Sequence, residues 1–302
     1  MPTALGRVSW TVGGLVFNQI DDNGVTWAIE RTQGWYDGSP VRLRNTPKGQ
    51  EAGDYRSKSR RGSKTVVLAG WVKAPTTALI ESARNAITAL QDGNQFQVVW
   101  ASVNSARYIM AEFSDTPLIA PTGDGRDLDF QMTLLQVDPD RYYWDPLAAG
   151  PVSLTAGPVG VPSASSGLDY VTGGGLDYVT GGGLNYGTVT STGVAALGNP
   201  GTATAYPVFT LAGPLTQPTI TDQASGAALA YTGAALASGE TLVIDTRAKT
   251  VQRNGVNRRR ELTTAQFNQM VISPGASKTY VLSSQNPSDT GTMTVSITPG
   301  DR

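Results

Sequence analysis

The chain has 302 residues, contains neither Cys nor His, and carries 23 Lys and Arg against 24 Asp and Glu, a formal net charge of -1. Without Cys it has no disulfide, thiol nucleophile, zinc–thiolate site or iron–sulfur cluster. Without His it has no Ser-His-Asp triad and no imidazole acid–base step. The near-zero charge argues against a general nucleic-acid binder, which is expected to be basic.

Composition divides the chain into three predicted parts. All six Trp lie before residue 145, and no Lys or Arg occurs between Arg141 and Arg247. We predict an N-terminal domain over 1–145, a Gly-rich connector over 146–198 and a C-terminal domain over 199–302. No apolar run approaches the roughly 20 residues that span a bilayer, and the first residues lack the apolar stretch of a secretory signal. We therefore expect no membrane insertion and synthesis in a cytoplasm.

The N-terminal part is predicted to consist mainly of strands. Asp22-Asn23-Gly24 is a tight-turn signal, and it predicts a hairpin of Gly13–Phe17 with Val25–Ile29. Apolar and polar residues alternate over Leu128–Val137, which is the period of a strand with one solvated face. Similar runs bounded by turn residues predict strands over Thr65–Val72, Phe96–Trp100 and Tyr108–Phe113.

One helix is predicted within this part, over Thr76–Leu90. Pro75-Thr76-Thr77 gives a start signal, and Asp92-Gly93 gives a stop signal. Between them an apolar stripe recurs at helical spacing; its members are Leu79, Ala83, Ala86, Ile87 and Leu90. Strands around one helix predict an α+β domain, with the helix laid across a sheet or barrel.

A long polar segment, Asn45–Lys64, separates two predicted strands. Structureless connections longer than about 12–15 residues are uncommon in compact domains. Three interpretations stay open: a solvated loop, an arm that grips a neighbouring subunit, and a nucleic-acid contact, against which the lack of interleaved aromatic residues argues. Its basic residues are the candidate contact residues of the arm: Arg56, Lys58, Arg60, Arg61 and Lys64.

The connector contains a repeat with a period of eight, in which Gly167–Gly174 recurs as Gly175–Gly182 and a degenerate copy follows. Tyr170, Tyr178 and Tyr186 recur with it. They form a candidate glycan-binding or partner-binding face, unless they pack between strands, which is usual for aromatic residues. The fourth Gly of the calcium-binding nonapeptide is absent, so no calcium site is expected.

The C-terminal part is predicted to be a β-sandwich of the jelly-roll, galectin-like or carbohydrate-module-like kind, because short strand candidates alternate with turn signals. Thr264–Met270 is predicted to form one helical turn. Arg258-Arg259-Arg260 is interpreted as surface charge, or as a contact for carboxylates across an oligomer interface. The strand candidates are Tyr206–Leu211, Glu240–Thr246, Thr250–Asn254, Lys278–Ser283 and Thr292–Thr298.

Clustered aspartates leave one catalytic route open. Pairs of carboxylates serve glycoside hydrolases, but Asp-Gly and Asp-Pro are also ordinary turn formers. We therefore expect no enzyme activity, no catalytic or metal-ligating residues and no cofactor. The two clusters are Asp124, Asp127 and Asp129, and Asp138, Asp140 and Asp145.

The order of these features resembles the distal tail protein of long-tailed, non-contractile bacteriophages. In the N-terminal part the resemblance rests on Trp27 after an Asn-Gly turn, Gly34-Trp35, the polar excursion, the helix and Asp138–Tyr143. In the C-terminal part it rests on Asn199–Pro207, Ala237–Thr246 with Thr250–Asn254, and Ser273–Lys278. The octapeptide repeat departs from the short linker of that family.

The resemblance implies a virion structural protein. N-terminal domains of that family form a hexameric ring, so Asn45–Lys64 becomes the arm that embraces a neighbour, and the sandwich projects outward. The implied role is an adaptor at the tail tip, which joins the tail tube to the tail-tip hub protein and carries host-adsorption parts. Receptor-binding proteins or host glycans are further implied partners, and no nucleic acid is. The alternative is a carbohydrate-binding β-sandwich module on a phage or cell surface.

Overall fold

The computed structural model describes residues 3–4, 6, 8–43, 46–48, 52, 54–55, 60–162 and 193–302. These residues are mainly β, with antiparallel strand pairing and a single α-helix among them. The predicted fold class is thereby confirmed. In the described part of the chain, no helix is long and apolar enough to cross a membrane.

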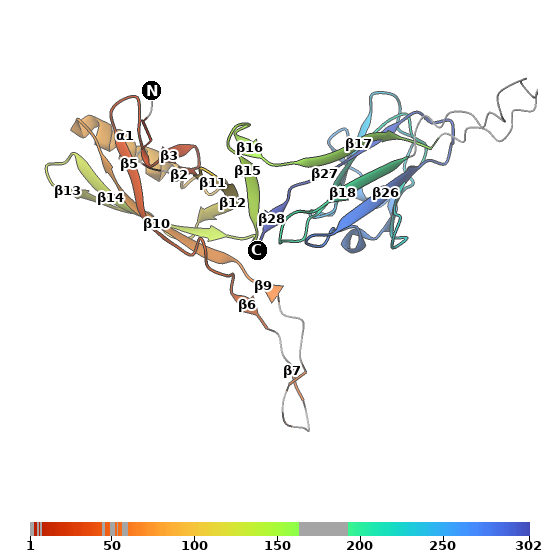
Figure 1. Cartoon of the computed structure of the whole chain (residues 1–302), viewed down its shortest axis with the longest axis horizontal. Coiled ribbons are helices and arrows are strands. Elements are labelled where there is room, and N and C mark those ends of the chain that lie inside the picture. Colours follow the sequence, from red (N-terminus) through yellow and green to blue (C-terminus); the bar gives the residue numbers. More distant parts are fainter. Residues whose placement is uncertain are drawn as a thin grey trace, which may run out of the picture. The chain divides into compact units, whose positions relative to one another are not determined.

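The chain folds into two compact units (Figure 1). The N-terminal unit comprises residues 1–152 and 300–302, and the C-terminal unit comprises residues 153–299. This division falls inside the connector predicted over 146–198, because β17 (Leu154–Gly160) and β18 (Val194–Gly198) both pair with strands of the C-terminal unit. The register of β17 shifts between Ala156 and Val159, around Gly157 at φ 108°. That irregularity hides the alternation by which a strand is recognised in a sequence.

One large antiparallel sheet forms the N-terminal unit, and several strands join it off its main path. β13 (Leu118–Thr122) extends β14, while β15 (Arg141–Asp145) pairs with β12, with β16 (Gly150–Pro151) and with β28 (Gly300–Asp301). The main path runs β1 (Thr3–Ala4), β4 (Gln19–Ile20), β5 (Thr26–Gln33), β10 (Lys64–Lys73), β14 (Asp127–Gln136), β12 (Ala106–Phe113), β11 (Phe96–Ser102), β2 (Val8–Val12) and β3 (Leu15–Phe17).

The predicted hairpin partner of Val25–Ile29 is wrong, although the Asn23-Gly24 turn is present. This turn joins β4 to β5, whereas β3 pairs with β2. The reason is that Gly13 and Gly14, at φ 54° and 92°, themselves form the tight turn between β2 and β3. The sequence-based prediction had placed both glycines inside a strand.

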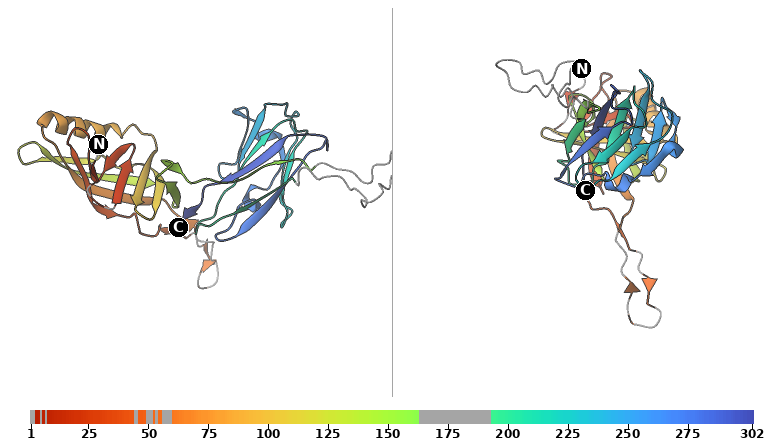
Figure 2. Two further views of the ribbon diagram at one scale, coloured as in Figure 1. Left: turned by 45° about the horizontal axis from the view of Figure 1, so that its top comes forward. Right: turned by 90° about the vertical axis from the view of Figure 1, so that its right-hand side faces the viewer.

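The single helix, α1 (Thr77–Ala89), confirms the predicted one. Its N-cap residue, Thr76, accepts a hydrogen bond from the Leu79 amide at 3.4 Å, which supplies a partner that the first turn otherwise lacks. The helix buries Ile80, Ala83 and Ile87, and it lies along one face of the sheet (Figure 2). The alternation of β14 is also confirmed, since the side chains at 128, 130, 132 and 134 are at most 3% exposed.

The C-terminal unit has two sheets around one apolar core, as predicted for a sandwich. The helical turn predicted within Thr264–Met270 is present as a short 3-10 turn, η2 (Phe267–Gln269), which follows the end of a strand and buries Phe267. The first sheet orders β17, β27 (Thr292–Ile297), β19 (Val208–Ala212), β22 (Thr241–Asp245), β23 (Thr250–Arg253) and β24 (Val256–Asn257). The second orders β18, β26 (Ser277–Ser283), β20 (Thr219–Asp222), β21 (Ala228–Tyr231) and β25 (Leu262–Ala265).

Candidate functional site

The polar excursion between β5 and β10 is the most distinctive candidate site. Two short ladders belong to it: β6 (Val41–Arg42) pairs with β9 (Arg60–Arg61), and β7 (Thr46–Pro47) pairs with β8 (Asp54–Tyr55). Both ladders lead away from the sheet (Figure 1). The described parts of this excursion are thus a two-stranded arm, and we call residues 39–63 the arm.

The predicted contact residues of the arm fall into three groups. Arg56 and Lys58 lie outside the described residues. Arg60 is exposed on β9, where a partner can reach it. Arg61 is half-buried and Lys64 is only 6% exposed, and both bind groups of their own unit. Lys64 was predicted to contact a neighbouring subunit. In the structure its side chain faces into its own unit, because Lys64 begins β10 in the same phase as the buried Val66.

Lys64 ties the two ends of the arm together. Its Nζ donates hydrogen bonds to the carbonyl oxygens of Trp35 at 3.0 Å and of Asp37 at 2.5 Å. Arg141 Nη1 donates to the same Trp35 oxygen at 3.1 Å. Burial, with smaller contributions from the charges of Arg141 and Arg61, lowers the pKa of Lys64 to about 8 against the opposing attraction of Asp37. A buried cation therefore fixes the chain just before the arm to the chain just after it.

Arg61 adds a second fixed point at the base of the arm. Its guanidinium pairs with the Asp140 carboxylate at 2.5 Å and also donates to Ser39 Oγ at 3.3 Å and to the Pro139 carbonyl at 3.0 Å. Gln136, only 1% exposed, donates from Nε2 to the Asp140 carbonyl at 3.0 Å. Several donors on one guanidinium fork define its orientation, so the arm leaves the unit in a set direction.

The backbone at Gly34 allows the arm to begin where it does. Gly34 has φ 83°, and a Cβ built there would lie 2.1 Å from the Thr65 carbonyl oxygen. No other residue type has room for this close approach. The next residue, Trp35, is 2% exposed and packs edge-on against Trp10, with 4.8 Å between ring centroids. A glycine and a buried indole thus anchor the strand that leads into the arm.

Most of the aspartates considered for catalysis serve in ion pairs, turns and hydrogen bonds, and Asp129 is exposed on β14. Asp127 lies 3.5 Å from Lys73 Nζ, and Asp145 accepts the amides of Leu147 and Ala148 in a turn. Asp138 accepts the Tyr142 hydroxyl at 2.5 Å. Among the described residues, no three carboxylates are grouped so that they could hold a metal ion.

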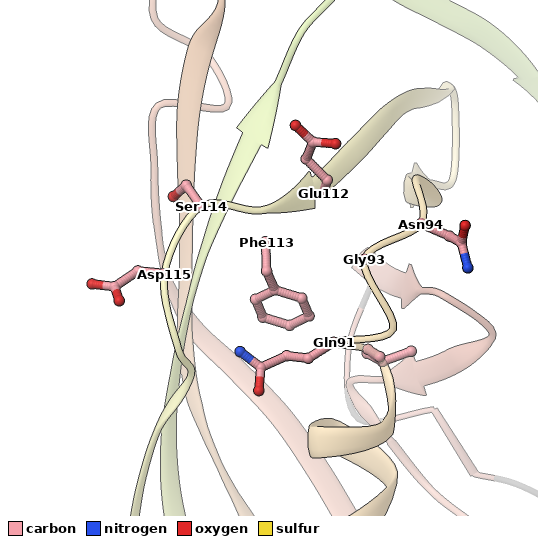
Figure 3. A pocket seen from close by; sticks show the side chains of 8 residues that line it. Gln91, Gly93, Asn94, Glu112, Phe113, Ser114 and Asp115 are labelled. Carbon is pink, nitrogen blue, oxygen red and sulfur yellow. The ribbon is translucent and has the colours of Figure 1, made fainter.

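A hollow of about 280 Å³ lies beside the C-terminal end of α1 (Figure 3). The ring of Phe113 and the side chain of Gln91 extend toward one another, whereas the carboxylates of Glu112 and Asp115 point in different directions. The hollow therefore lacks a pair of converging titratable groups. Its lining residues are Leu90, Gln91, Gly93, Asn94, Glu112, Phe113, Ser114 and Asp115.

The tyrosines predicted to form a glycan-binding or partner-binding face are not tested by the structure. Tyr170, Tyr178 and Tyr186 lie outside the described residues. In the sandwich, Tyr231 is 1% exposed and Tyr280 is fully buried against Phe209. A sugar cannot stack on either ring while the sandwich is folded.

Comparisons with known proteins point to one family. Residues 200–297 match the family model of the siphovirus-type tail component, C-terminal domain. The fold matches the crystal structure of the Dit protein of phage SPP1, described as a paradigm of the hub adsorption apparatus in Gram-positive infecting phages. That match has a TM-score of 0.60 and 10% identity over 97% of this chain and 98% of that chain.

A chain of the phage P2 baseplate, in its activated conformation with Ca, gives a TM-score of 0.48 with 9% identity over 96% of this chain and 97% of that chain. No curated protein matched the chain in a sequence search. The family match and the shared Dit fold confirm the resemblance to distal tail proteins predicted from the sequence.

Proposed function

We propose that this bacteriophage tail component is a ring-forming distal tail adaptor, hexameric in the assembled particle, which joins the tail tube to the tail-tip hub protein and carries host-adsorption parts. Its place is the tail tip of the virion, after synthesis in the host cytoplasm. The N-terminal unit forms the ring in this proposal, and each arm binds the next subunit. Head-to-tail contacts of this kind generate closed rings when the rotation between neighbours closes.

The surface of the arm carries this proposal. Two large apolar side chains stand exposed on the outgoing side of the arm, Val41 at 61% and Leu43 at 60%, and Tyr36, just before the arm, is 63% exposed. These exposed apolar groups can supply the apolar contacts of an interface, and the exposed Arg60 beside them can supply its polar contacts. The arm is also fixed at its base by Lys64 and Arg61. A projecting segment with a set direction and an uncovered apolar surface supports binding to a second copy of the chain.

Shortening the arm tests this proposal. Replacing residues 43–59 by Asn-Gly would connect β6 to β9 through a two-residue turn and leave Lys64, Arg61 and their partners in place. We expect light scattering and negative-stain images to show rings for the native chain and monomers for this variant. At a protein concentration too low for ring contacts to stabilise the native chain, Trp fluorescence should show the same urea midpoint for both chains, because every Trp lies outside the replaced residues.

A variant of full length separates charge from shape. Changing Arg56, Lys58 and Arg60 together to Gln keeps the apolar side chains of the arm, and it should weaken the ring most at low salt, where exposed charges act most strongly. A native chain that stays monomeric at high concentration and forms no ring in particles would contradict the ring. An unchanged oligomer after shortening would contradict the role of the arm.

We further infer a structural rather than a catalytic role. The carboxylates Asp127, Asp138, Asp140 and Asp145 are each engaged in an ion pair, a hydrogen bond or a turn. The carbohydrate-module alternative has less support, because Tyr231 and Tyr280 lie in the core of the sandwich. A glycan array probed with the full chain would decide in its favour if binding were lost after Tyr206→Ala, the half-exposed tyrosine of the sandwich.

A further inference from the structure

Three consecutive arginines in the C-terminal unit surround a hollow that the ring proposal does not use. β24 ends at Asn257, and the 3-10 turn η1 (Arg259–Glu261) follows. The hollow measures about 510 Å³, and its lining residues are Asn257, Arg258, Arg259, Arg260 and Glu261. We call these five residues the arginine turn. Three arginines and one glutamate therefore line one hollow, and no residue of an apolar type lines it.

Local hydrogen bonds hold the backbone of the arginine turn. The Arg258 amide donates to the Val251 carbonyl on β23 at 2.8 Å. The Arg259 amide donates to Asn257 Oδ1 at 2.9 Å. The Glu261 amide donates to the Arg258 carbonyl at 3.0 Å. The turn is therefore attached to a strand of the sandwich, and its shape is defined before any ligand arrives.

The carboxylate of Glu261 orients one of the guanidinium groups. Glu261 Oε1 accepts Arg258 Nη1 at 3.2 Å, and Oε2 accepts the hydroxyl of the buried Tyr231 at 2.5 Å. Gly233 leaves room for this carboxylate, since a Cβ there would lie 2.1 Å from Oε2. Two of the possible bonds of Glu261 are thus internal, and it cannot neutralise the other two arginines at the same time.

The remaining two arginines differ in their surroundings. Arg259 lies over the ring of Phe267, with 4.7 Å from Cζ to the ring centroid, which is a cation–π arrangement. Such stacking leaves the edge of the guanidinium, where the N–H groups lie, open to a ligand. Arg260 is exposed and has no ion pair with any residue that the structure describes.

We propose that the arginine turn is a binding site for a phosphate-bearing polyanion. Successive phosphate groups of one chain present several acceptor oxygens and negative charges close together, which can serve more than one guanidinium, whereas a single carboxylate carries one charge and saturates a single fork. All five lining residues are polar or charged, whereas a protein partner favours apolar side chains at the centre of its interface. The ligand is a chain of phosphate groups, from a surface polymer or from soluble polyphosphate. The proposal concerns the sandwich alone and does not rest on ring formation.

Calorimetric titration of the full chain with tripolyphosphate tests the site. We expect saturable binding at low salt, and Arg260→Gln should weaken it about five- to ten-fold, the loss of one exposed charge-assisted contact. Arg260→Lys keeps the charge but lacks the planar fork, so it should weaken binding about three-fold. Citrate should bind more weakly than tripolyphosphate. A soluble phosphodiester polymer such as polyglycerol phosphate distinguishes the two sources. If the natural ligand is a surface polymer, polyglycerol phosphate should bind at least as tightly as tripolyphosphate.

A matched variant in the other unit controls for general charge. Arg84→Gln also removes one exposed cation, here from α1, where Arg84 pairs with Glu81 at 2.8 Å. Binding should change less than two-fold in this variant. Equal weakening by Arg84→Gln and Arg260→Gln would overturn the site, as would an absence of tripolyphosphate binding at low salt. Equal affinity for citrate would overturn the phosphate class. The calorimetric unfolding of each variant verifies that its sandwich is folded.

Discussion

A lysine at the base of the arm occupies a position that apolar side chains usually take. Lys64 is 6% exposed, and its pKa lies near 8, below the ordinary 10.5, chiefly because of burial. The unfolded chain therefore holds this proton more tightly than the folded chain. Between pH 8 and 10.5 the unfolded state binds more protons, so stability rises with pH across this interval.

We accordingly expect the N-terminal unit to gain stability between pH 7 and 10. The gain should be about 1–2 kcal/mol, allowing for partial relaxation around the ammonium group. Urea unfolding followed by Trp fluorescence measures it, since all Trp residues lie in this unit. The series should stop at pH 10, because Tyr143, whose pKa is raised first by burial and then by Asp301, lowers stability above that point.

Lys64→Met is the control for this assignment, because it keeps the length of the side chain and removes the titrating group. The gain with pH should disappear in this variant. If it persists, another group causes it and the assignment to Lys64 fails. The Trp35 carbonyl keeps its bond from Arg141 in the variant, at 3.1 Å in the native chain, so the base of the arm loses only part of its contacts.

Lys64 also illustrates what a residue pattern does and does not reveal. Val66 and Leu68 are fully buried, and Lys64 shares their phase on β10. The alternation in the sequence therefore contained a signal that Lys64 faces inward. The basic run in which it lies instead favoured an outward position. The deciding partners, the carbonyls of Trp35 and Asp37, are backbone groups, and no sequence pattern identifies them as acceptors.

At the scale of elements, helices and strands with a strong local pattern could be predicted from the sequence, whereas short or irregular strands could not. α1 and β14 each repeat one period over ten or more residues, and both were predicted. β28 has two residues and no period, and it pairs with β15, about 160 positions earlier in the chain. Only a long-range contact defines such a strand, so local reasoning cannot find it.

β28 nevertheless contributes to the N-terminal unit. Asp301 pairs with Arg107 at 2.9 Å and accepts the Tyr143 hydroxyl at 3.0 Å, and the guanidinium of Arg107 lies 3.8 Å from the Tyr143 ring centroid. The two partners of this ion pair are 25% and 21% exposed. Partial burial makes the pair stronger than a surface one, and it leaves Arg107 without its partner when Asp301 is lost.

Removing residues 300–302 should therefore destabilise the N-terminal unit by about 1–3 kcal/mol. The Trp-monitored urea midpoint is expected to fall, although the deleted residues lie at the opposite end of the sequence from most of the unit. Asp301→Asn should give a smaller fall, since it keeps the backbone pairing of β28 with β15. An unchanged midpoint in the truncated chain would show that β28 adds no stability.

The molecule as a whole consists of two units with separate cores and separate optical probes. The N-terminal core holds the indoles of Trp10, Trp27 and Trp35, whereas residues 153–299 contain no Trp. The composition change near residue 145, from which we predicted three parts, lies close to the division between these two units. Both ends of the predicted connector supply strands to the sandwich, which composition alone does not indicate.

A buried ion pair in the sandwich can test whether the units unfold independently. Asp222 is fully buried, and its carboxylate binds Lys278 Nζ at 2.6 Å and Ser225 Oγ at 2.5 Å. Burial raises its pKa, but the hydrogen bonds from Lys278, Ser225 and the Ala224 amide outweigh burial and leave it below the ordinary value. Its contribution to stability is therefore present above about pH 4 and is lost as the pH falls further.

Asp222→Asn should destabilise only the C-terminal unit, by about 2–4 kcal/mol, because it leaves the ammonium group of Lys278 without its counter-ion. For a unit of this size, that lowers the melting temperature by roughly 5–12 °C. Calorimetry should show one transition shifting, and Trp fluorescence should show no change. Asp129→Asn makes the same replacement at an exposed site on β14, and should shift neither transition by more than about 1 °C. If the Trp-monitored transition of Asp222→Asn shifts as much as the calorimetric one, the two units unfold together. If neither transition shifts, the Asp222–Lys278 pair adds no stability to the sandwich.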